Sequence, residues 1–313
     1  MITNKTVFIL GAGASQPFGY PTGRELRDNI LTNLMSPHQA NNICWKNRYD
    51  RFSKLGFTEK DISKFRDEFS RSTLYSIDAF LENRPDFNEI GKIAIADTLI
   101  PYEDEGRLFA TEKNWYSYLF NRMIPGCTFE KFAENKIAFI TFNYDRSLEH
   151  YLYNALKNTY DKQISEVTKA LNAIEILHVY GQLSFLPWQD TGGQAYEGKR
   201  AENPDYLKQS ANMIRIVHEN VDVNSDNVFV RAHKLLREAK NIFFLGFGYY
   251  ETNLDRLKMK DFIMGRDVMG TSLNLEPSKQ RDVNRYFQGK GTIRMSNKDT
   301  LAFLHDQIDI LWS

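Results

Sequence analysis

The sequence contains little cysteine, no excess of charge of either sign and no long apolar run. Its 313 residues include only two cysteines, Cys44 and Cys127, which excludes a disulfide framework and a four-cysteine zinc site within one chain. The 40 basic and 40 acidic side chains balance, which argues against a general electrostatic attraction to nucleic acid or anionic membranes. No segment approaches the about 20 apolar residues that span a bilayer, and the apolar run at residues 7–10 is too short for an export signal. We therefore expect a cytoplasmic protein with no membrane partner and no strong direct binding of nucleic acid.

Several common catalytic motifs are missing as well. The sequence has no Walker phosphate loop, no H-E-x-x-H helix and no G-x-S-x-G turn, which disfavours the usual phosphoryl transfer, zinc hydrolysis and α/β-hydrolase chemistry. The five histidines other than His178 show no metal-ligand spacing, so we expect no metal site. The composition is that of an ordinary globular chain, with 42% hydrophobic and 26% charged residues.

Short apolar segments alternate with stretches of helical periodicity. The apolar segments are rich in β-branched and aromatic residues, a pattern typical of strands buried on both faces of a parallel sheet. The expected strands are residues 6–10, 137–142, 174–177, 241–245, 271–275 and 292–295. Because strands that alternate with helices form βαβ units, the sequence predicts an α/β fold, a Rossmann-like parallel sheet with helices on both faces.

The segment from residue 36 to residue 135 has a different character. Glycine is sparse there, and aromatic and charged residues recur at helical spacing between prolines. The sequence therefore predicts an all-helical insertion, residues 36–135, within a discontinuous sheet domain made of residues 1–35 and 136–313. Residues 187–225 are polar and irregular, which indicates a long surface loop or a small lobe.

A glycine-rich turn follows the first expected strand. Gly11 and Gly13 stand between that strand and a helix, where glycine lets the backbone approach a phosphate and free N–H groups bind its oxygens. Gln16 stands where the dinucleotide-binding fingerprint has its third glycine. A glycine turn with no ligand is the competing interpretation. Gly246 and Gly248 follow the fourth strand and repeat the same pattern.

Polar residues end three other expected strands. Asn143 and Asp145 follow the second strand, His178 ends the third, and Glu276 ends the fifth, where an acidic side chain can hold an adenosine ribose. Asn143 offers a donor and an acceptor to a ribose hydroxyl or a water, and His178 can take up a proton near neutral pH. Two structural interpretations compete with these roles: Asp145 as the cap of the next helix, and His178 as a hydrogen-bonded histidine of the core.

Four motifs, in their order along the chain, resemble the NAD-binding core of the sirtuins. They are Gly11-Ala-Gly-Ala-Ser15, Gly19-Tyr-Pro21, Thr141-Phe-Asn-Tyr-Asp145 and His178-Val-Tyr-Gly181. Residues 76–86 and 90–95 resemble the helical region of a bacterial sirtuin-like subfamily that supplies NAD-depleting effectors in antiphage defence. The resemblance spans about residues 5–280.

The resemblance implies a role for each matching residue. Asn143 and Asp145 would hold the nicotinamide ribose and the attacking water, and His178 would be the general base. The turn at residues 11–15 would contact the diphosphate, and Tyr20 would flank the nicotinamide. The residues expected to bind NAD are Gly11, Ala12, Gly13, Ala14, Ser15, Tyr20, Pro21, Thr22, Gly246, Gly248 and Glu276.

The chain departs from the deacylating sirtuins in one respect. Those enzymes carry a four-cysteine zinc module, which two cysteines cannot build, and the insertion 36–135 stands in place of their zinc lobe. The departure disfavours protein deacylation and favours hydrolysis of NAD to nicotinamide and ADP-ribose. Because nicotinamide leaves as a neutral molecule, the site needs no general acid, only stabilisation of an oxocarbenium-like ribose and a positioned water.

Regulation and two other functions stay open on these grounds. An enzyme that consumes NAD has to be silent by default, so we expect a homo-oligomer, a separate activating defence protein, or both. The chain is alternatively a non-catalytic receptor for NAD or an ADP-ribose derivative that assembles when it binds. Transfer of ADP-ribose or acyl groups on a protein substrate is a third interpretation.

Overall fold

Six parallel strands form one sheet in a computed structural model that describes residues 1–35, 43–216 and 222–307. The strands are β1 (Thr6–Leu10), β2 (Ile137–Thr141), β3 (Glu175–His178), β4 (Asn241–Leu245), β5 (Asp267–Thr271) and β6 (Arg294–Ser296). Their order is β3-β2-β1-β4-β5-β6, and every neighbouring pair is parallel. The predicted α/β fold with a Rossmann-like parallel sheet is confirmed.

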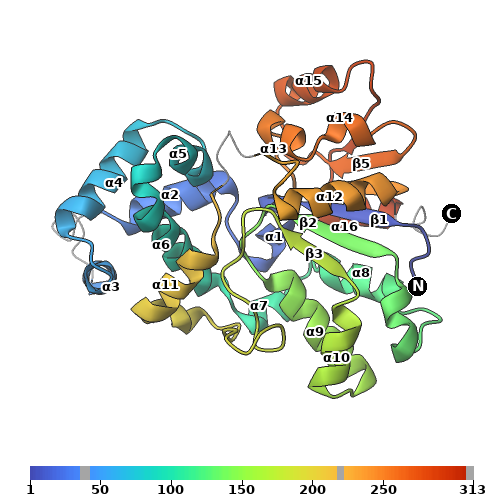
Figure 1. Ribbon diagram of the computed structural model, residues 1–313, viewed down its shortest axis with the longest axis horizontal. Coiled ribbons are helices and arrows are strands. Elements are labelled where there is room, and N and C mark those ends of the chain that lie inside the picture. Colours follow the sequence, from blue (N-terminus) through green and yellow to red (C-terminus); the bar gives the residue numbers. More distant parts are fainter. Residues whose placement is uncertain (36–42, 217–221, 308–313) are drawn as a thin grey trace.

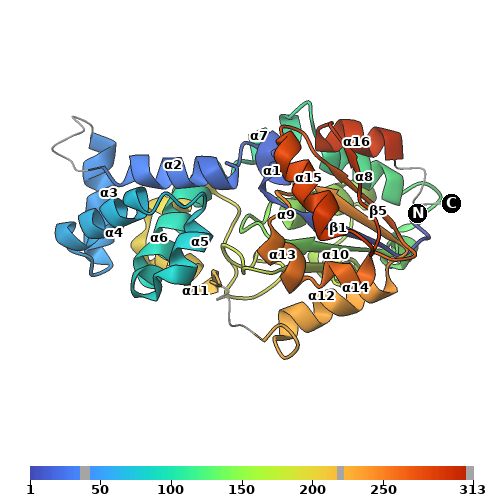
Figure 2. The same cartoon turned by 90° about the horizontal axis from the view of Figure 1, so that it is seen from above.

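Helices cover both faces of this sheet. Figure 2 shows α12 on one face and α8 with α16 on the other. The α-helices are α1 (Ala12–Ser15), α2 (Gly23–Asn33), α3 (Ile43–Lys54), α4 (Glu59–Arg71), α5 (Ile77–Asn83), α6 (Asn88–Leu99), α7 (Glu105–Ala110), α8 (Trp115–Met123), α9 (Ser147–Tyr160), α10 (Ile164–Leu171), α11 (Pro204–Met213), α12 (Asn227–Glu238), α13 (Glu251–Arg256), α14 (Met259–Phe262), α15 (Pro277–Tyr286) and α16 (Thr300–Gln307). Within the described residues, no helix combines the length and apolar character needed to cross a membrane.

The three central strands are held by a row of aromatic side chains. Phe8 in β1 lies in register with Phe139 in β2 and Phe243 in β4. Its ring stacks on the two neighbouring rings at centroid distances of 5.5 and 5.3 Å. All three side chains are fully buried, and each such burial contributes roughly 2–3 kcal/mol to folding. This packing fixes the centre of the sheet, from which the site projects.

A group of helices lies beside the sheet at one end of the molecule (Figure 1). We call α2–α6 and α11 the helical unit. Helix α6 lies at its centre, and its residues from Ile90 to Leu99 are buried except Lys92. Helices α2, α4, α5 and α11 pack against it.

Three helices pack across the boundaries predicted from the sequence. Helices α2 and α11 belong to the ranges assigned to the sheet domain but pack on α6, whereas α8 belongs to the range 36–135 but packs on α9 and α16. The two-domain division stays a prediction.

Two local predictions are wrong. The fifth strand is Asp267–Thr271, not residues 271–275, because Asn274 adopts a left-handed backbone with φ of +58° and the Leu275 N–H donates to the Ser272 carbonyl, closing a turn. The irregular segment 187–225 contains α11, which starts at Pro204 because proline is tolerated in the first turn and the Asn203 side chain caps the helix.

Candidate functional site

The strand order reverses at β1 and β4, and this reversal defines the place where α/β sheets bind ligands. In an open parallel sheet of order 3-2-1-4-5-6, the crevice lies outside the carboxyl ends of the two strands at the reversal. Here those strands end at Leu10 and Leu245, so the glycine turns that begin at Gly11 and Gly246 lie side by side.

The glycines of these turns pack against each other. Gly11 N–H donates to the Leu245 carbonyl and Gly13 N–H to the Gly246 carbonyl, both at 3.0 Å. Gly246 has a φ of +56°, and a Cβ there would lie 2.0 Å from the Ala14 nitrogen. The glycines therefore serve the close approach of two turns, and two of the N–H groups expected for a diphosphate are bonded within the protein.

Polar side chains that follow β1 and β2 in the chain meet beside these turns. The Asn143 amide nitrogen donates to the Gly11 carbonyl at 3.0 Å and lies 2.9 Å from the Ser15 hydroxyl. The Ser15 hydroxyl donates to Asp145 Oδ2 at 2.7 Å. All three side chains are buried. The structure thus brings together three residues that the sequence placed on different strand ends.

Asp145 has both a local and a long-range contact. Its Oδ1 accepts the Ser147 N–H at 3.2 Å and the Ser147 hydroxyl, at the start of α9. The cap position of α9 is occupied by Arg146 and not by Asp145, so Asp145 accepts hydrogen bonds from the first residue of the helix without being its cap. Burial raises the pKa of the Asp145 carboxyl, against the opposing effect of hydrogen bonds from Ser147 and Ser15. A buried carboxylate with a raised pKa is suited to accept a proton.

His178 has a partner on each ring nitrogen. Its Nδ1 lies 2.8 Å from the Asn143 carbonyl oxygen, and its Nε2 lies 2.6 Å from Glu149 Oε1. The side chains of His178 and Glu149 are buried, to 5% and 3% exposure. Burial lowers the pKa of His178, but the Glu149 carboxylate outweighs it and the net shift is upward. A general-base role requires one of the two contacts to open.

Glu149 is a candidate functional residue that the strand-end pattern does not indicate. It lies in the first turn of α9, four residues after Asp145, which precedes the helix, and this spacing is the local signal for it.

The other residues expected to bind NAD have different surroundings. Tyr20 is buried near the cluster, and its hydroxyl contacts that of Tyr196 at 2.9 Å. Thr22 caps α2 in a capping box with Glu25, and Gly248 is exposed next to the Tyr250 ring. Ala12 and Ala14 lie in α1, directly after Gly11, and Pro21 is buried just before α2.

Glu276 does not end a strand as predicted. It is exposed and stands at the cap position of α15, five residues after β5 ends. Thr271 ends β5 instead, and its hydroxyl accepts the Gly246 N–H at 2.8 Å. The contact that joins the end of β5 to the glycine turns therefore comes from a threonine and not from an acidic side chain.

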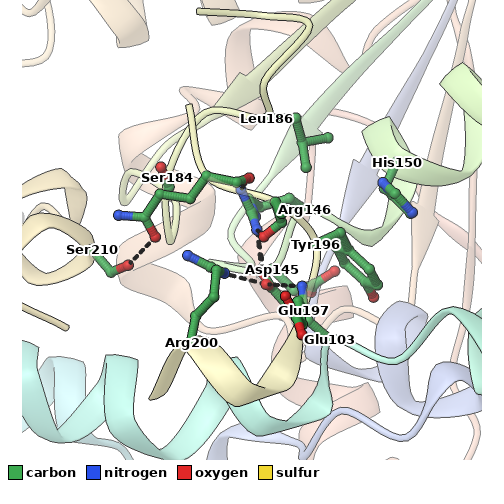
Figure 3. A network of polar contacts seen from close by, with 12 residues as sticks. Glu103, Asp145, Arg146, His150, Ser184, Leu186, Tyr196, Glu197, Arg200 and Ser210 are labelled. Carbon is green, nitrogen blue, oxygen red and sulfur yellow. Dashed lines mark hydrogen bonds and ion pairs between the residues drawn. The ribbon is translucent and has the colours of Figure 1, made fainter. Parts of the chain in front are cut away.

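A buried ionic network, missed by sequence analysis, lies next to Asp145 (Figure 3). Arg146 donates to both carboxylate oxygens of Glu103 at 2.8 Å and to the carbonyls of Phe185, Gln194 and Ala195. Arg200 donates to the same carboxylate at 2.5 Å. Arg146 and Glu103 are 43 residues apart in the chain, so no local pattern signals the pair. These contacts hold Arg146, the residue that follows Asp145, in place.

A cavity of about 970 Å³ adjoins this network. Its wall includes Glu103, His150, Trp188 and Tyr196, and Figure 3 shows His150 and Tyr196 side by side. Asn143, Asp145 and His178 are not part of the wall. The cavity therefore lies on the Tyr196 side of Tyr20, apart from the predicted crevice.

Within the described residues, no group of three or more histidine, cysteine or acidic side chains is arranged to hold a metal ion. The Cys127 thiol is free and donates to the Thr128 carbonyl. The side chain of Cys44 lies outside the described part of the chain.

Comparisons with known proteins do not assign the chain to a family. No protein-family model matches it, and no curated protein matches it. The sirtuin-like assignment therefore stays a prediction.

Proposed function

We propose that the protein cleaves the nicotinamide–ribose bond of NAD with water, giving nicotinamide and ADP-ribose. The observation that supports this most is the buried Ser15–Asn143–Asp145 cluster beside the glycine turns of β1 and β4. The turns lie at the reversal of strand order where open α/β sheets bind dinucleotides, and the cluster offers an amide and a carboxylate at the same edge. The order of the four sirtuin-like motifs supports the same substrate.

The chemistry requires an anion and a positioned water. Loss of nicotinamide leaves positive charge on the ribose, which a carboxylate in a buried site stabilises strongly. Asp145 supplies that carboxylate, and its raised pKa suits it to accept the proton of the attacking water. Both hydrogens of the Asn143 amide nitrogen are donated to Gly11 and Ser15, so the amide is fixed and its oxygen is the atom that accepts from a ribose hydroxyl or the water.

Release of nicotinamide from NAD by the purified protein, followed by chromatography, tests the proposal. We expect Asn143→Ala to lower the rate by about 100-fold, the usual cost of losing one positioned polar group. Asn158→Ala is the matched control, because Asn158 is an exposed amide on α9 that donates to the Asn154 carbonyl, away from the cluster. Full activity of Asn143→Ala would reject the site.

Binding without turnover is the outcome that would favour a receptor. Calorimetry that shows NAD binding, with NAD recovered intact at every protein concentration and after phage challenge, would replace the hydrolase proposal with the receptor. Radiolabel from NAD on a protein would favour transfer instead.

We also propose, from the sirtuin-like motifs, that the activity serves antiphage defence and is controlled by self-assembly or a separate activating protein. Light scattering with and without NAD measures the assembly. Expression in a bacterial host, with cellular NAD measured before and after phage infection, tests the defence role. A monomer at all concentrations and unchanged NAD after infection would contradict both.

A further inference from the structure

Glu149 and His178 form a buried pair that contacts the backbone of Asn143. Glu149 lies on α9 and its Oε1 is 2.6 Å from His178 Nε2. The opposite ring nitrogen, Nδ1, lies 2.8 Å from the Asn143 carbonyl oxygen. The imidazole therefore bridges a carboxylate and the backbone of the residue that we place at the centre of the site.

The partners of the ring dictate where its protons lie. A carbonyl oxygen can only accept a hydrogen bond, so Nδ1 carries a proton in every charge state that keeps this contact. The contact between Nε2 and Glu149 then shares a second proton, either as an imidazolium with a carboxylate or as a neutral ring with a carboxylic acid. A proton that the ring takes up goes to Nε2.

Nε2 faces away from the Asn143 carbonyl. Glu149 lines a second cavity, of about 450 Å³, together with residues of α10, β3 and Arg231. The proton-accepting side of His178 therefore faces Glu149 and this cavity, whereas Nδ1–H faces Asn143. This arrangement suits His178 to hold Asn143 in place better than it suits His178 to take a proton from a water beside Asn143.

We propose that Glu149 is a positioning residue: its carboxylate keeps the His178 ring positively charged, and this charge strengthens the Nδ1–H bond that holds the Asn143 carbonyl and thereby orients the Asn143 amide. The link to catalysis rests on the proposed hydrolysis of NAD. The charged groups that act on the His178 ring are Glu149, on α9, and Asp145, before α9.

Glu149→Gln is the variant that tests this, because glutamine keeps the size of the side chain and removes its charge. The pKa of His178 is measured by NMR of histidine-labelled protein, with His178→Gln to assign the resonance. We expect the pKa to fall by at least about one unit, since one unit corresponds to a modest loss of charge stabilisation. The Asn143 carbonyl ¹³C shift should move with the titration of His178 in the wild-type protein, and in the variant the same movement should occur at lower pH.

The kinetic expectation is a loss in kcat with little change in KM. We expect Glu149→Gln to lower kcat by about tenfold, and the alkaline limb of the pH profile to shift toward lower pH with the pKa of His178. Glu149→Asp, which keeps the charge, should restore part of both, and it serves in place of glutamine should that variant fail to fold.

Glu105→Gln is the matched control. Glu105 pairs with His150 Nε2 at 2.7 Å, so the variant removes the charge from a second, more exposed histidine–glutamate contact that involves a residue of α9 and lies outside the Asn143 cluster. We expect it to leave the pKa of His178 and kcat unchanged.

Two results would overturn the proposal: an unchanged pKa of His178 in Glu149→Gln, or a lowered pKa with an unaltered Asn143 shift and kcat. If the wild-type protein releases no nicotinamide from NAD, the proposed function fails, and the two NMR readouts still decide whether Glu149 positions Asn143 through His178.

Discussion

The two halves of the sheet's carboxyl edge are built in different ways. After β1 and β4, backbone meets backbone: Gly11, Gly13 and Gly246 approach so closely that a Cβ on Gly246 has no room. After β2 and β3, polar side chains meet: those of Asn143 and Asp145 bond to Ser15, and His178 lies between the Asn143 carbonyl and Glu149. We call these the glycine half and the polar half.

The difference separates shape from chemistry. The glycine half sets how near a ligand or a neighbouring turn can come, and it tolerates almost no side chain. The polar half sets the charges and proton positions, and it tolerates isosteric changes of side chain that keep its shape. Substitutions in the glycine half should therefore damage stability first, and substitutions in the polar half should damage activity first.

Gly246→Ala should produce the largest effect. The new Cβ would lie 2.0 Å from the Ala14 nitrogen, on a residue whose φ is +56°, so the two turns would have to separate. We expect the free energy of unfolding to fall by at least about 3 kcal/mol, measured by equilibrium unfolding in urea.

Gly126→Ala is the control for backbone conformation alone. Gly126 has a φ of +65°, and a Cβ added there would meet no atom within 4 Å, so we expect a loss of about 1 kcal/mol. Equal losses in the two variants would show that backbone conformation, and not the contact between turns, makes glycine necessary at residue 246.

Local patterns predicted the positions of the site but not its contacts. Gly11, Asn143 and His178 could be placed at strand ends because each directly follows or ends an apolar segment of strand length. The partner of Gly13 is the Gly246 carbonyl, more than two hundred residues away along the chain, and only the order of the strands brings them together. The same holds for Arg146 and Glu103, whose separation of 43 residues leaves no local signal.

The fifth strand shows how a local pattern misleads. Residues 271–275 alternate in a way that favours a strand, but the left-handed backbone at Asn274 makes them a turn. The same pattern predicts Glu276 at the edge of the sheet, whereas it stands at the first position before α15 and makes no capping hydrogen bond through its side chain.

Asp145→Asn should affect activity far more than stability. The variant keeps the shape of the side chain and part of its bonding to Ser15 and Ser147, so we expect a loss of about 1 kcal/mol in the free energy of unfolding. Nicotinamide release should fall by about 100-fold, because the charge that stabilises the ribose cation is gone.

Asp97→Asn is the opposite case in the helical unit. Asp97 is a buried aspartate paired with Arg48 and Arg51, so removal of its charge should cost about 2 kcal/mol of stability. Nicotinamide release per folded molecule should stay within about twofold of the wild-type rate, since distant sites act independently. Equal losses of activity in Asp145→Asn and Asp97→Asn would refute the conclusion that the polar half carries the chemistry.

The smallest expected effect is a dependence of stability on pH that comes from the polar half. Because Glu149 raises the pKa of His178 in the folded protein, the histidine binds its proton more tightly there than in the unfolded chain. Its contribution to stability is complete below about pH 6.5, the unfolded value, and is lost as the pH rises through the folded value. The free energy of unfolding in urea, measured from about pH 6 to about pH 9, should therefore decline across this window, and the decline should shrink in Glu149→Gln and persist in Glu105→Gln.

Burial also raises the pKa of Asp145, so this carboxyl adds a decline of the same sign that starts near about pH 4 and is shared by all three proteins. The difference between wild type and Glu149→Gln isolates the histidine, and identical curves for the two would show that the Glu149 contact does not hold a proton on His178.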